Sequence, residues 1–354
     1  MESLRRVLVR LPNPLGDAVM ATPALRALRR GLPDAEIHAL GPPQHEPLLA
    51  GVEGFDVYHP YRGRSFAALR ERARALQDLA FDVAVILPDS PRAALDAVVA
   101  RIPRRIGYGR DWLRRALLTQ SIDAPREHGQ RVPFSMIERY LRIPRLLGIP
   151  DAGDRLTLVV SEADKDAADA ALSAVGVARD DAMLLVSPGA AFGRSKLWPP
   201  RHFAQACDEI TRRFGLRVVL APAPNPEEEA IAAQVAQAMQ EACVVLPPTD
   251  GLGTFKAVVA RATLVLTNDT GPRHLAVALD RPVVTLMGPT DPRHTAHHLE
   301  RQRVLFLDLA CRPCHAKECP LGHQRCLVDL PPEQAVEAAA QLLSRQAEAP
   351  RQAH

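Results

Sequence analysis

Three short polar stretches of the sequence follow apolar runs and carry residue types that could bind an anion or move a proton. The first, TNDTGPRHLA at 267–276, follows the apolar run ATLVL. Asp269 ends a predicted strand, and Thr270 and Gly271 begin the next helix, where free backbone N–H groups and the helix dipole favour an anion. His274 lies one turn into that helix. The stretch indicates a phosphate site, although an ordinary helix cap with a solvated histidine fits the same residues.

The second stretch is SPGAAFGRSKLWPP, at 187–200, and it also follows an apolar run. Gly189 and Gly193 allow the backbone to approach a ligand closely. Lys196 stands out because the chain has only four lysines and otherwise uses arginine. A lysine in this loop suggests a compact charge beside a phosphate, and an exposed loop lysine is the alternative. We expect Trp198 to brace the loop.

The third stretch, RLPNPLGDAVMATPALRAL at 10–28, places Gly16 and Asp17 at the start of the first predicted helix. A carboxylate in that position caps a helix, or it acts as a general base that accepts the proton of an attacking hydroxyl. Taken alone, the stretch favours the cap.

The elements that must position these residues alternate between strand and helix. In the first half, strands are expected at 5–11, 36–41, 55–60 and 81–88, and helices at 18–32, 65–80 and 90–102. Ser65 and Ser90 are expected N-caps. A second alternating series runs from 182–190 to 282–289. The alternation predicts an α/β protein with two doubly wound, Rossmann-like domains, with ligand sites at the carboxyl ends of the strands, facing a cleft.

The domain boundary is expected near a segment rich in Gly, Pro and Asp that precedes a polar helix at 161–176. This assigns 1–155 to an N-terminal domain and 156–330 to a C-terminal domain. Residues 331–354 form a last helix and tail, for which packing on either domain stays open, including a return onto the N-terminal domain.

Composition and charge limit the expected location and partners of the protein. The chain has 354 residues and a formal net charge of +3. No apolar stretch approaches the ~20 residues that cross a bilayer, and the start lacks the pattern of a signal peptide, so we expect a cytoplasmic protein. Residues 1–150 hold 23 Arg and no Lys against 16 acidic residues. This asymmetry suggests an anionic partner for the first half, and a solvated arginine-rich surface explains it equally well.

Together, the three stretches resemble glycosyltransferase family 9, the lipopolysaccharide heptosyltransferases. The similarity covers LGDAVMATPAL, PGAAFGRSKLWP, NDTGPRHLAVALDRPVVTLMGPTDP and the tail CRPCHAKECPLGHQRCL, which looks like the heptosyltransferase II branch. The resemblance implies a GT-B fold, with the nucleotide sugar on the C-terminal domain and the acceptor on the N-terminal one. It also implies ADP-heptose as donor, an anionic heptosylated Kdo–lipid A core as acceptor, inversion at the anomeric carbon, no organic cofactor and no catalytic metal.

The resemblance also assigns roles to residues of this sequence. The family's proposed base matches Asp17, and its phosphate-contacting lysine matches Lys196. The family's donor-site residues match Asp269, Thr270, Gly271 and His274. With Lys196, and with Gly16 and Gly189 of the glycine-containing loops, these form the expected donor-binding set. The sequence departs from the family pattern at Pro272 and Arg273, so a related nucleotide sugar stays open as the donor. An acidic residue of the family falls within 227–229, at no single aligned position.

The arginine-rich stretch at 101–115 carries Tyr108 and Trp112. It suits contact with phosphorylated lipid A or with the surface of the inner membrane, where the enzyme would bind peripherally. Its GYG lacks the third glycine of a dinucleotide fingerprint, and no nucleic-acid partner is expected.

Two places in the sequence carry residues that could ligate a metal ion. The CRPC spacing is common in zinc sites, and four thiols lie within sixteen residues: Cys311, Cys314, Cys319 and Cys326. A packed, reduced loop is the alternative interpretation. The Asp-x-Asp triplet at 164–166 is interpreted as charge at a helix start rather than as a metal site.

Two other functions fit the same architecture. One is a nucleotide-sugar epimerase on the same fold, which needs no acceptor. The other is a non-catalytic module that binds a nucleotide sugar or the lipid core.

Overall fold

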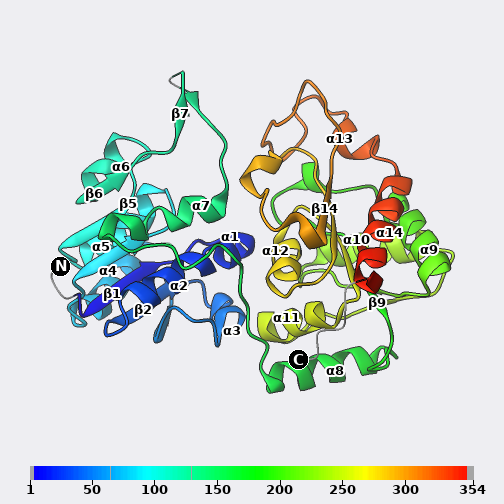
Figure 1. The fold of residues 1–354 in the computed structure, drawn as a ribbon, viewed down its shortest axis with the longest axis horizontal. Coiled ribbons are helices and arrows are strands. Elements are labelled where there is room, and N and C mark those ends of the chain that lie inside the picture. Colours follow the sequence, from blue (N-terminus) through cyan, green and yellow to red (C-terminus); the bar gives the residue numbers. More distant parts are fainter. Residues whose placement is uncertain (1–3, 64, 129, 349–354) are drawn as a thin grey trace. The chain divides into compact units, whose positions relative to one another are not determined.

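The computed structural model describes residues 4–63, 65–128 and 130–348. The chain forms two compact units (Figure 1). The first comprises Met1–Val159 with Arg293–His297, and the second comprises Val160–Pro292 with His298–His354. The sequence placed the change of domain at 155–156, and it did not predict the return of 293–297 to the first unit.

The first unit is built on a six-stranded parallel sheet with the order β3-β2-β1-β4-β5-β6. Its strands are β1 Arg6–Arg10, β2 Glu36–Gly41, β3 Val57–Pro60, β4 Val83–Ile86, β5 Arg104–Tyr108 and β6 Gln120–Ile122. Its helices are α1 Leu15–Met20, α2 Thr22–Gly31, α3 His45–Leu49, α4 Phe66–Gln77, α5 Pro91–Val99, α6 Trp112–Leu117 and α7 Met136–Leu141. A short hairpin, β7 Arg126–Glu127 with β8 Gln130–Arg131, and a 3₁₀ turn, η1 Pro144–Leu147, complete it.

The second unit repeats this topology with the order β11-β10-β9-β12-β13-β14. Its strands are β9 Met183–Ser187, β10 Arg217–Leu220, β11 Cys243–Val245, β12 Leu264–Asn268, β13 Val283–Leu286 and β14 Gln302–Leu305. Its helices are α8 Glu162–Ala174, α9 Pro200–Phe214, α10 Pro226–Ala238, α11 Gly251–Arg261, α12 Gly271–Ala278, α13 Arg325–Val328 and α14 Pro332–Glu348. Short 3₁₀ turns are η2 Arg194–Lys196, η3 Pro292–His294 and η4 Leu299–Arg301. The predicted α/β, doubly wound architecture is therefore confirmed in both halves.

Local sequence signals explain several of the element boundaries. Ser65 and Ser90 cap α4 and α5, because their hydroxyls accept hydrogen bonds from Ala68 and Ala93. The helix expected over 18–32 is instead two helices, α1 and α2, that join at Ala21. Pro23 stands in the first turn of α2, where its missing N–H is harmless, so it starts a new helix there.

The last helix completes the second core. Ala335, Val336, Ala339 and Leu342 of α14 are buried with Trp198 in one apolar cluster. The helix packs against α9 and the β13–β14 edge of the sheet (Figure 1). The sequence left open which domain the last helix packs on, and the structure places it on the second unit.

The Asp-x-Asp triplet lies at the start of α8, as interpreted from the sequence. Ser161 and Asp164 form a reciprocal capping box there. Asp164 Oδ2 also lies 3.6 Å from Nζ of the fully buried Lys256 on α11. Its carboxylate therefore has a structural role.

No helix among the described residues is long and apolar enough to span a membrane.

Candidate functional site

Two of the chemically suggestive stretches follow neighbouring strands of the second sheet. The stretch with Lys196 follows β9 and the one with Asp269 follows β12, and these strands pair directly. The chain runs outward in opposite directions from this pair, which makes it the topological switch point of the sheet. Ligands of doubly wound sheets bind outside the carboxyl ends of the strands at such a point.

A buried ion pair joins the two stretches. Lys196 Nζ donates to Asp269 Oδ2 at 2.8 Å and to the Asp269 carbonyl at 2.7 Å. Among the described residues these are its two hydrogen-bond acceptors, and an ammonium group has three N–H donors. The Lys196 side chain is 12% exposed, and its Nζ also lies 5.1 Å from the centroid of the Phe192 ring, so one N–H donor has no hydrogen-bond acceptor among these residues.

Asp269 is held by more than Lys196. Its Oδ1 accepts from Arg273 Nη1 at 2.9 Å, and its Oδ2 accepts from the Thr290 hydroxyl at 2.6 Å. Burial alone raises the pKa of the Asp269 carboxyl, but the charges of Lys196 and Arg273 and the hydrogen bonds hold that pKa well below its usual range. The carboxylate therefore stays ionised and orients the lysine.

Arg273, which departs from the family pattern, is buried at 1% exposure inside this network. Its guanidinium binds Asp269 and the side-chain carbonyl of Gln302, at 3.0 Å from Nη2. Arg273 therefore stabilises the network around Asp269. Two cations face one carboxylate, so the cluster of Lys196, Asp269 and Arg273 carries one net positive charge, which suits an anionic ligand.

Asn268 fastens the two loops together and was not singled out in the sequence. Its side-chain amide donates to the carbonyls of Pro188 and Gly189, at 2.6 and 3.2 Å. Its side-chain oxygen accepts from the Trp198 backbone N–H at 3.2 Å. The fully buried Trp198 indole donates to Leu330, which confirms that Trp198 braces the loop. The signal that could have identified Asn268 was its polar side chain at the end of an apolar strand.

The glycines of the second stretch are explained by close packing. A Cβ added at Gly189 would lie 2.0 Å from the Glu228 carboxylate. Gly193 has a φ of +154°, and a Cβ there would lie 2.5 Å from the Lys317 carbonyl. Glu228 also accepts from the Ala223 N–H at 3.0 Å. Of the acidic residues at 227–229, Glu228 is thus the one placed against the Gly189 loop.

The start of α12 lies beside the charged cluster. Thr270 is its N-cap residue but makes no side-chain capping bond, and its hydroxyl donates to the Asn268 carbonyl at 3.3 Å. Thr270 and Gly271 are partly exposed, whereas His274 is buried. Burial, together with the charge of Arg273, lowers the pKa of His274 to about 3, so its imidazole is neutral at physiological pH. The structure brings all four predicted residues of this stretch to one end of β12.

The third stretch follows β1, which pairs with β4 at the switch point of the first sheet. Gly16 and Asp17 are partly exposed residues in the first turn of α1, and Pro14 occupies the N-cap position. The cap interpretation therefore does not describe Asp17. The carboxylate instead accepts a hydrogen bond from Tyr140 of α7. Burial and the Asp17 charge raise the pKa of Tyr140 well above its usual value, so the phenol remains a donor.

A second charged cluster lies beyond the same end of the first sheet. Arg10 and Arg72 both pair with Asp96, at 3.4 and 2.6 Å. Arg10 also donates to the hydroxyl of Tyr61 at 2.5 Å. These three charged groups again carry one net positive charge. An adjacent open pocket of about 780 Å³ is lined by Asn13, Pro42, Pro43, Gln44, Tyr61, Arg62 and Gly63.

The chain resembles known proteins over nearly its whole length. The model of glycosyltransferase family 9 (heptosyltransferase) matches residues 69–325. Lipopolysaccharide heptosyltransferase 2 of Salmonella typhimurium is 30% identical over 356 residues, which cover 96% of this chain and 99% of that protein.

The chain belongs to glycosyltransferase family 9.

Solved structures of family members agree with this. The Escherichia coli ADP-heptose LPS heptosyltransferase II is 26% identical and superposes with a TM-score of 0.79, over 97% of this chain and 100% of that one. The family 9 glycosyltransferase of Veillonella parvula, 24% identical, has a TM-score of 0.82 over 98% of this chain and 99% of its own. This family 9 enzyme therefore has the GT-B fold.

The arginine-rich stretch of this glycosyltransferase divides into buried and exposed parts. Arg114 is fully buried and donates to the carbonyls of Tyr108, Ser90 and Pro88, at 3.2, 3.1 and 2.9 Å. Tyr108 is buried as well, whereas Trp112 is 79% exposed. Of the two aromatic residues in the stretch, Trp112 is therefore the one that presents a surface.

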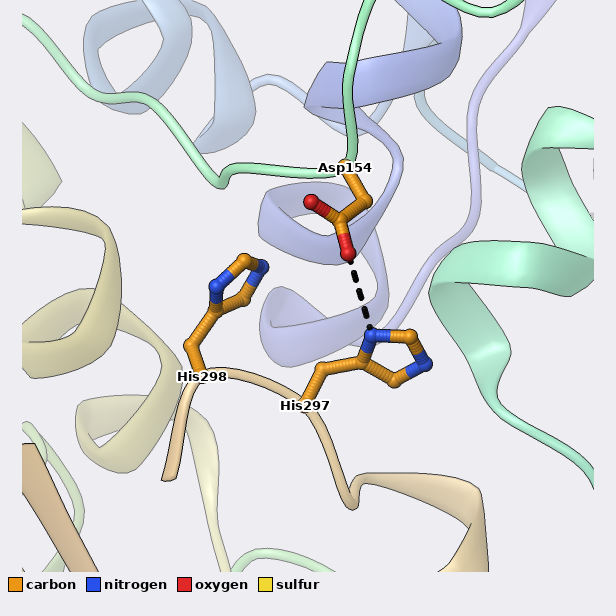
Figure 2. A group of neighbouring side chains, drawn as sticks. All are labelled: Asp154, His297 and His298. Carbon is orange, nitrogen blue, oxygen red and sulfur yellow. Dashed lines mark hydrogen bonds and ion pairs between the residues drawn. The ribbon is translucent and has the colours of Figure 1, made fainter. Parts of the chain in front are cut away.

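The returning segment 293–297 of the enzyme is tied to the first unit by polar contacts. His297 Nδ1 lies 3.4 Å from Asp154 Oδ2, with His298 next in the chain (Figure 2). His294 Nδ1 lies 3.2 Å from the Phe134 carbonyl. Since the Asp154 side chain is 54% exposed, the pair with His297 adds at most about 1 kcal/mol to stability. We interpret it as a surface contact.

Proposed function

We propose that the chain transfers heptose from ADP-heptose to the inner core of lipopolysaccharide, heptosylated Kdo–lipid A, with inversion at the anomeric carbon. The observation that carries the proposal is the net positive cluster of Lys196, Asp269 and Arg273 beside the start of α12, within a chain whose named relatives are heptosyltransferases. A donor whose sugar is joined to a nucleoside through a diphosphate carries negative charge that suits such a site.

On the donor side, the free N–H of Lys196 and the backbone at Thr270 and Gly271 bind the diphosphate. As the glycosidic bond breaks, negative charge grows on the departing ADP. A preoriented ammonium group and a helix N-terminus stabilise that charge more in the transition state than in the bound donor. Asp269 holds the ammonium in place. His274, buried one turn into α12, adds a neutral imidazole at the same end of β12.

On the acceptor side, Asp17 is the general base. The acceptor hydroxyl oxygen forms a bond to the anomeric carbon while the bond from that carbon to the ADP oxygen breaks. The hydroxyl proton passes to the Asp17 carboxylate, and ADP leaves with the electron pair. Attack from the face opposite the leaving group inverts the configuration in one step. The pocket beside Arg62 and the Arg10–Arg72–Asp96 cluster offers positive charge for an anionic core sugar.

The test is incubation of the purified chain with ADP-heptose and a panel of truncated lipopolysaccharide cores, read by mass spectrometry. The proposal predicts one heptose increment on one core. A binding module would give no product with any core, and an epimerase would change the sugar of ADP-heptose without any acceptor. Parallel reactions with other nucleotide heptoses and hexoses would define the donor.

Tyr140 is expected to position the base. In Tyr140→Phe the Asp17 carboxylate loses its phenol donor, and kcat should fall about 10-fold, or ~1.4 kcal/mol, with the Kd of ADP unchanged. Initial rates at saturating substrate and an ADP titration measure the two. Tyr108→Phe is the matched control, because its buried hydroxyl has no hydrogen-bond partner among the described residues. Equal kcat values for the two variants would contradict the role of Tyr140.

The enzyme is also expected to bind the inner membrane surface peripherally, through Trp112 and Leu113 of α6, which are 79% and 45% exposed. Arg110 and Arg115 are exposed beside them and suit anionic headgroups. Trp112→Ala should reduce flotation with anionic vesicles about 5- to 20-fold, since it removes a large apolar contact. Leu321→Ala, at an exposed position of the second unit, is the control. Equal binding to zwitterionic vesicles, unaffected by Trp112→Ala, would refute the assignment.

A further inference from the structure

Of the six cysteines, three lie in the loop that leads from β14 to α13 and a fourth, Cys326, lies on α13 itself, all outside the residues assigned to transfer. Cys314 is exposed, Cys311 and Cys319 are partly buried, and Cys326 on α13 is buried. All four are free thiols. A loop that needed only apolar packing would not require thiols at exposed positions.

The turn that follows Cys319 surrounds its sulfur with backbone donors. Gln324 N–H donates to Cys319 Sγ at 3.3 Å, and backbone N–H groups of Leu321, Gly322 and His323 point to the same atom. Gly322 closes the turn with φ of +71° and a hydrogen bond to the Cys319 carbonyl at 3.0 Å. Several N–H donors around one sulfur suit a thiolate, which carries a full negative charge, better than a neutral thiol. Thiolate is the form that binds metals.

The other three thiols lie in the neighbourhood of Cys326. Cys311, Cys314 and Cys319 are all close enough to Cys326 to interact with it electrostatically. Within the described residues no three of these sulfurs lie within 4.8 Å of one another. Sulfurs about 2.3 Å from one tetrahedral ion lie closer together than this, so metal binding requires the loop to bring the four cysteines inward.

The same loop is bonded to the elements that hold the charged cluster. Arg312 donates to the carbonyls of Gly288, Leu307 and Thr290, and Thr290 in turn donates to Asp269. The Ser195 N–H and hydroxyl, next to Lys196, donate to the carbonyls of Lys317 and Ala316 at 3.0 and 2.5 Å. The cysteine loop is therefore hydrogen-bonded both to the segment that holds Asp269 and to the segment that carries Lys196, so fixing the loop also fixes these two residues.

We propose that Cys311, Cys314, Cys319 and Cys326 bind one transition-metal ion in a tetrahedral all-sulfur site, which fixes the loops that carry Lys196 and Thr290. The four-thiolate set fits zinc or iron. The site is structural, because four protein ligands leave no open position for a substrate. The inference does not depend on the identity of the transferred sugar.

The test is metal analysis of the full chain, purified without a histidine tag, together with thermal melting. We expect about one zinc or iron per chain. Cys314→Ser should lose most of this metal and lower the melting temperature by several degrees, although Cys314 is exposed and its replacement would otherwise be neutral. Cobalt substituted into the wild type should show thiolate-to-metal charge transfer, and Cys314→Ser should lose that band.

Cys243→Ser is the matched control, because Cys243 lies on β11 outside the loop. It should keep the metal and the cobalt spectrum. Wild type without stoichiometric metal, even after reconstitution under reducing conditions with zinc or iron, would overturn the proposal. So would metal content and melting temperature that are the same in Cys314→Ser and wild type.

Discussion

Asp17→Asn is expected to lower kcat for heptose transfer by about 10²- to 10⁴-fold, the range that a general base contributes. The amide keeps the size of the carboxylate and accepts the Tyr140 hydrogen bond, but it does not take the proton of the acceptor hydroxyl. The Kd of ADP should be unchanged, because the residues proposed to bind it lie in the second unit. Single-turnover rates and an ADP titration check the two quantities separately.

The control for this substitution is Asp78→Asn, at an exposed position just beyond the end of α4 in the same unit. It should leave both quantities unchanged. A rate in Asp17→Asn within tenfold of wild type would show that another group accepts the proton.

The second large effect is expected at Lys196. Lys196→Met keeps a long apolar stem and removes the charge, so it deprives the departing diphosphate of its oriented cation. We expect kcat to fall by about 10²- to 10³-fold, as when one preorganised donor is removed from an active site, and the affinity for ADP to fall as well. The variant also leaves Asp269 with one cation fewer, so the melting temperature should be recorded beside the kinetics.

Lys165→Met is the matched control for Lys196→Met. Lys165 is half exposed and pairs with Glu162 on the surface of α8, where an ion pair contributes little. It should be neutral in turnover, in ADP binding and in stability. Unchanged ADP affinity and turnover in Lys196→Met would remove the lysine from the donor site.

The sequence predicted the parts of the site that follow from strand periodicity. Asp269 and Lys196 each follow a buried strand, and the order of a doubly wound sheet brings the ends of adjacent strands together. Their polar character after an apolar run was the signal that made them candidates. The role of Asp269 differs in detail from a ligand contact, since both carboxylate oxygens are occupied by side chains of the protein.

The contacts that sequence reasoning missed join segments that are far apart in the chain. Tyr140 reaches Asp17 from α7, a helix that was not predicted. Arg273 finds Gln302 on β14, a strand that was not predicted. Arg114 belongs to a stretch that the sequence suggested to be surface charge, but the structure buries it against three backbone carbonyls. No sequence pattern shows that such carbonyls come together around one guanidinium. Such partners depend on tertiary packing, which overrides local propensity.

The most direct test of the account is the anomeric configuration of the transferred heptose, measured by NMR on the product of the wild-type reaction with ADP-heptose and the accepting core. A single displacement by a hydroxyl that Asp17 deprotonates predicts a configuration opposite to that of the donor. Retention of the donor configuration, or no heptose on any core while ADP still binds, would contradict the account.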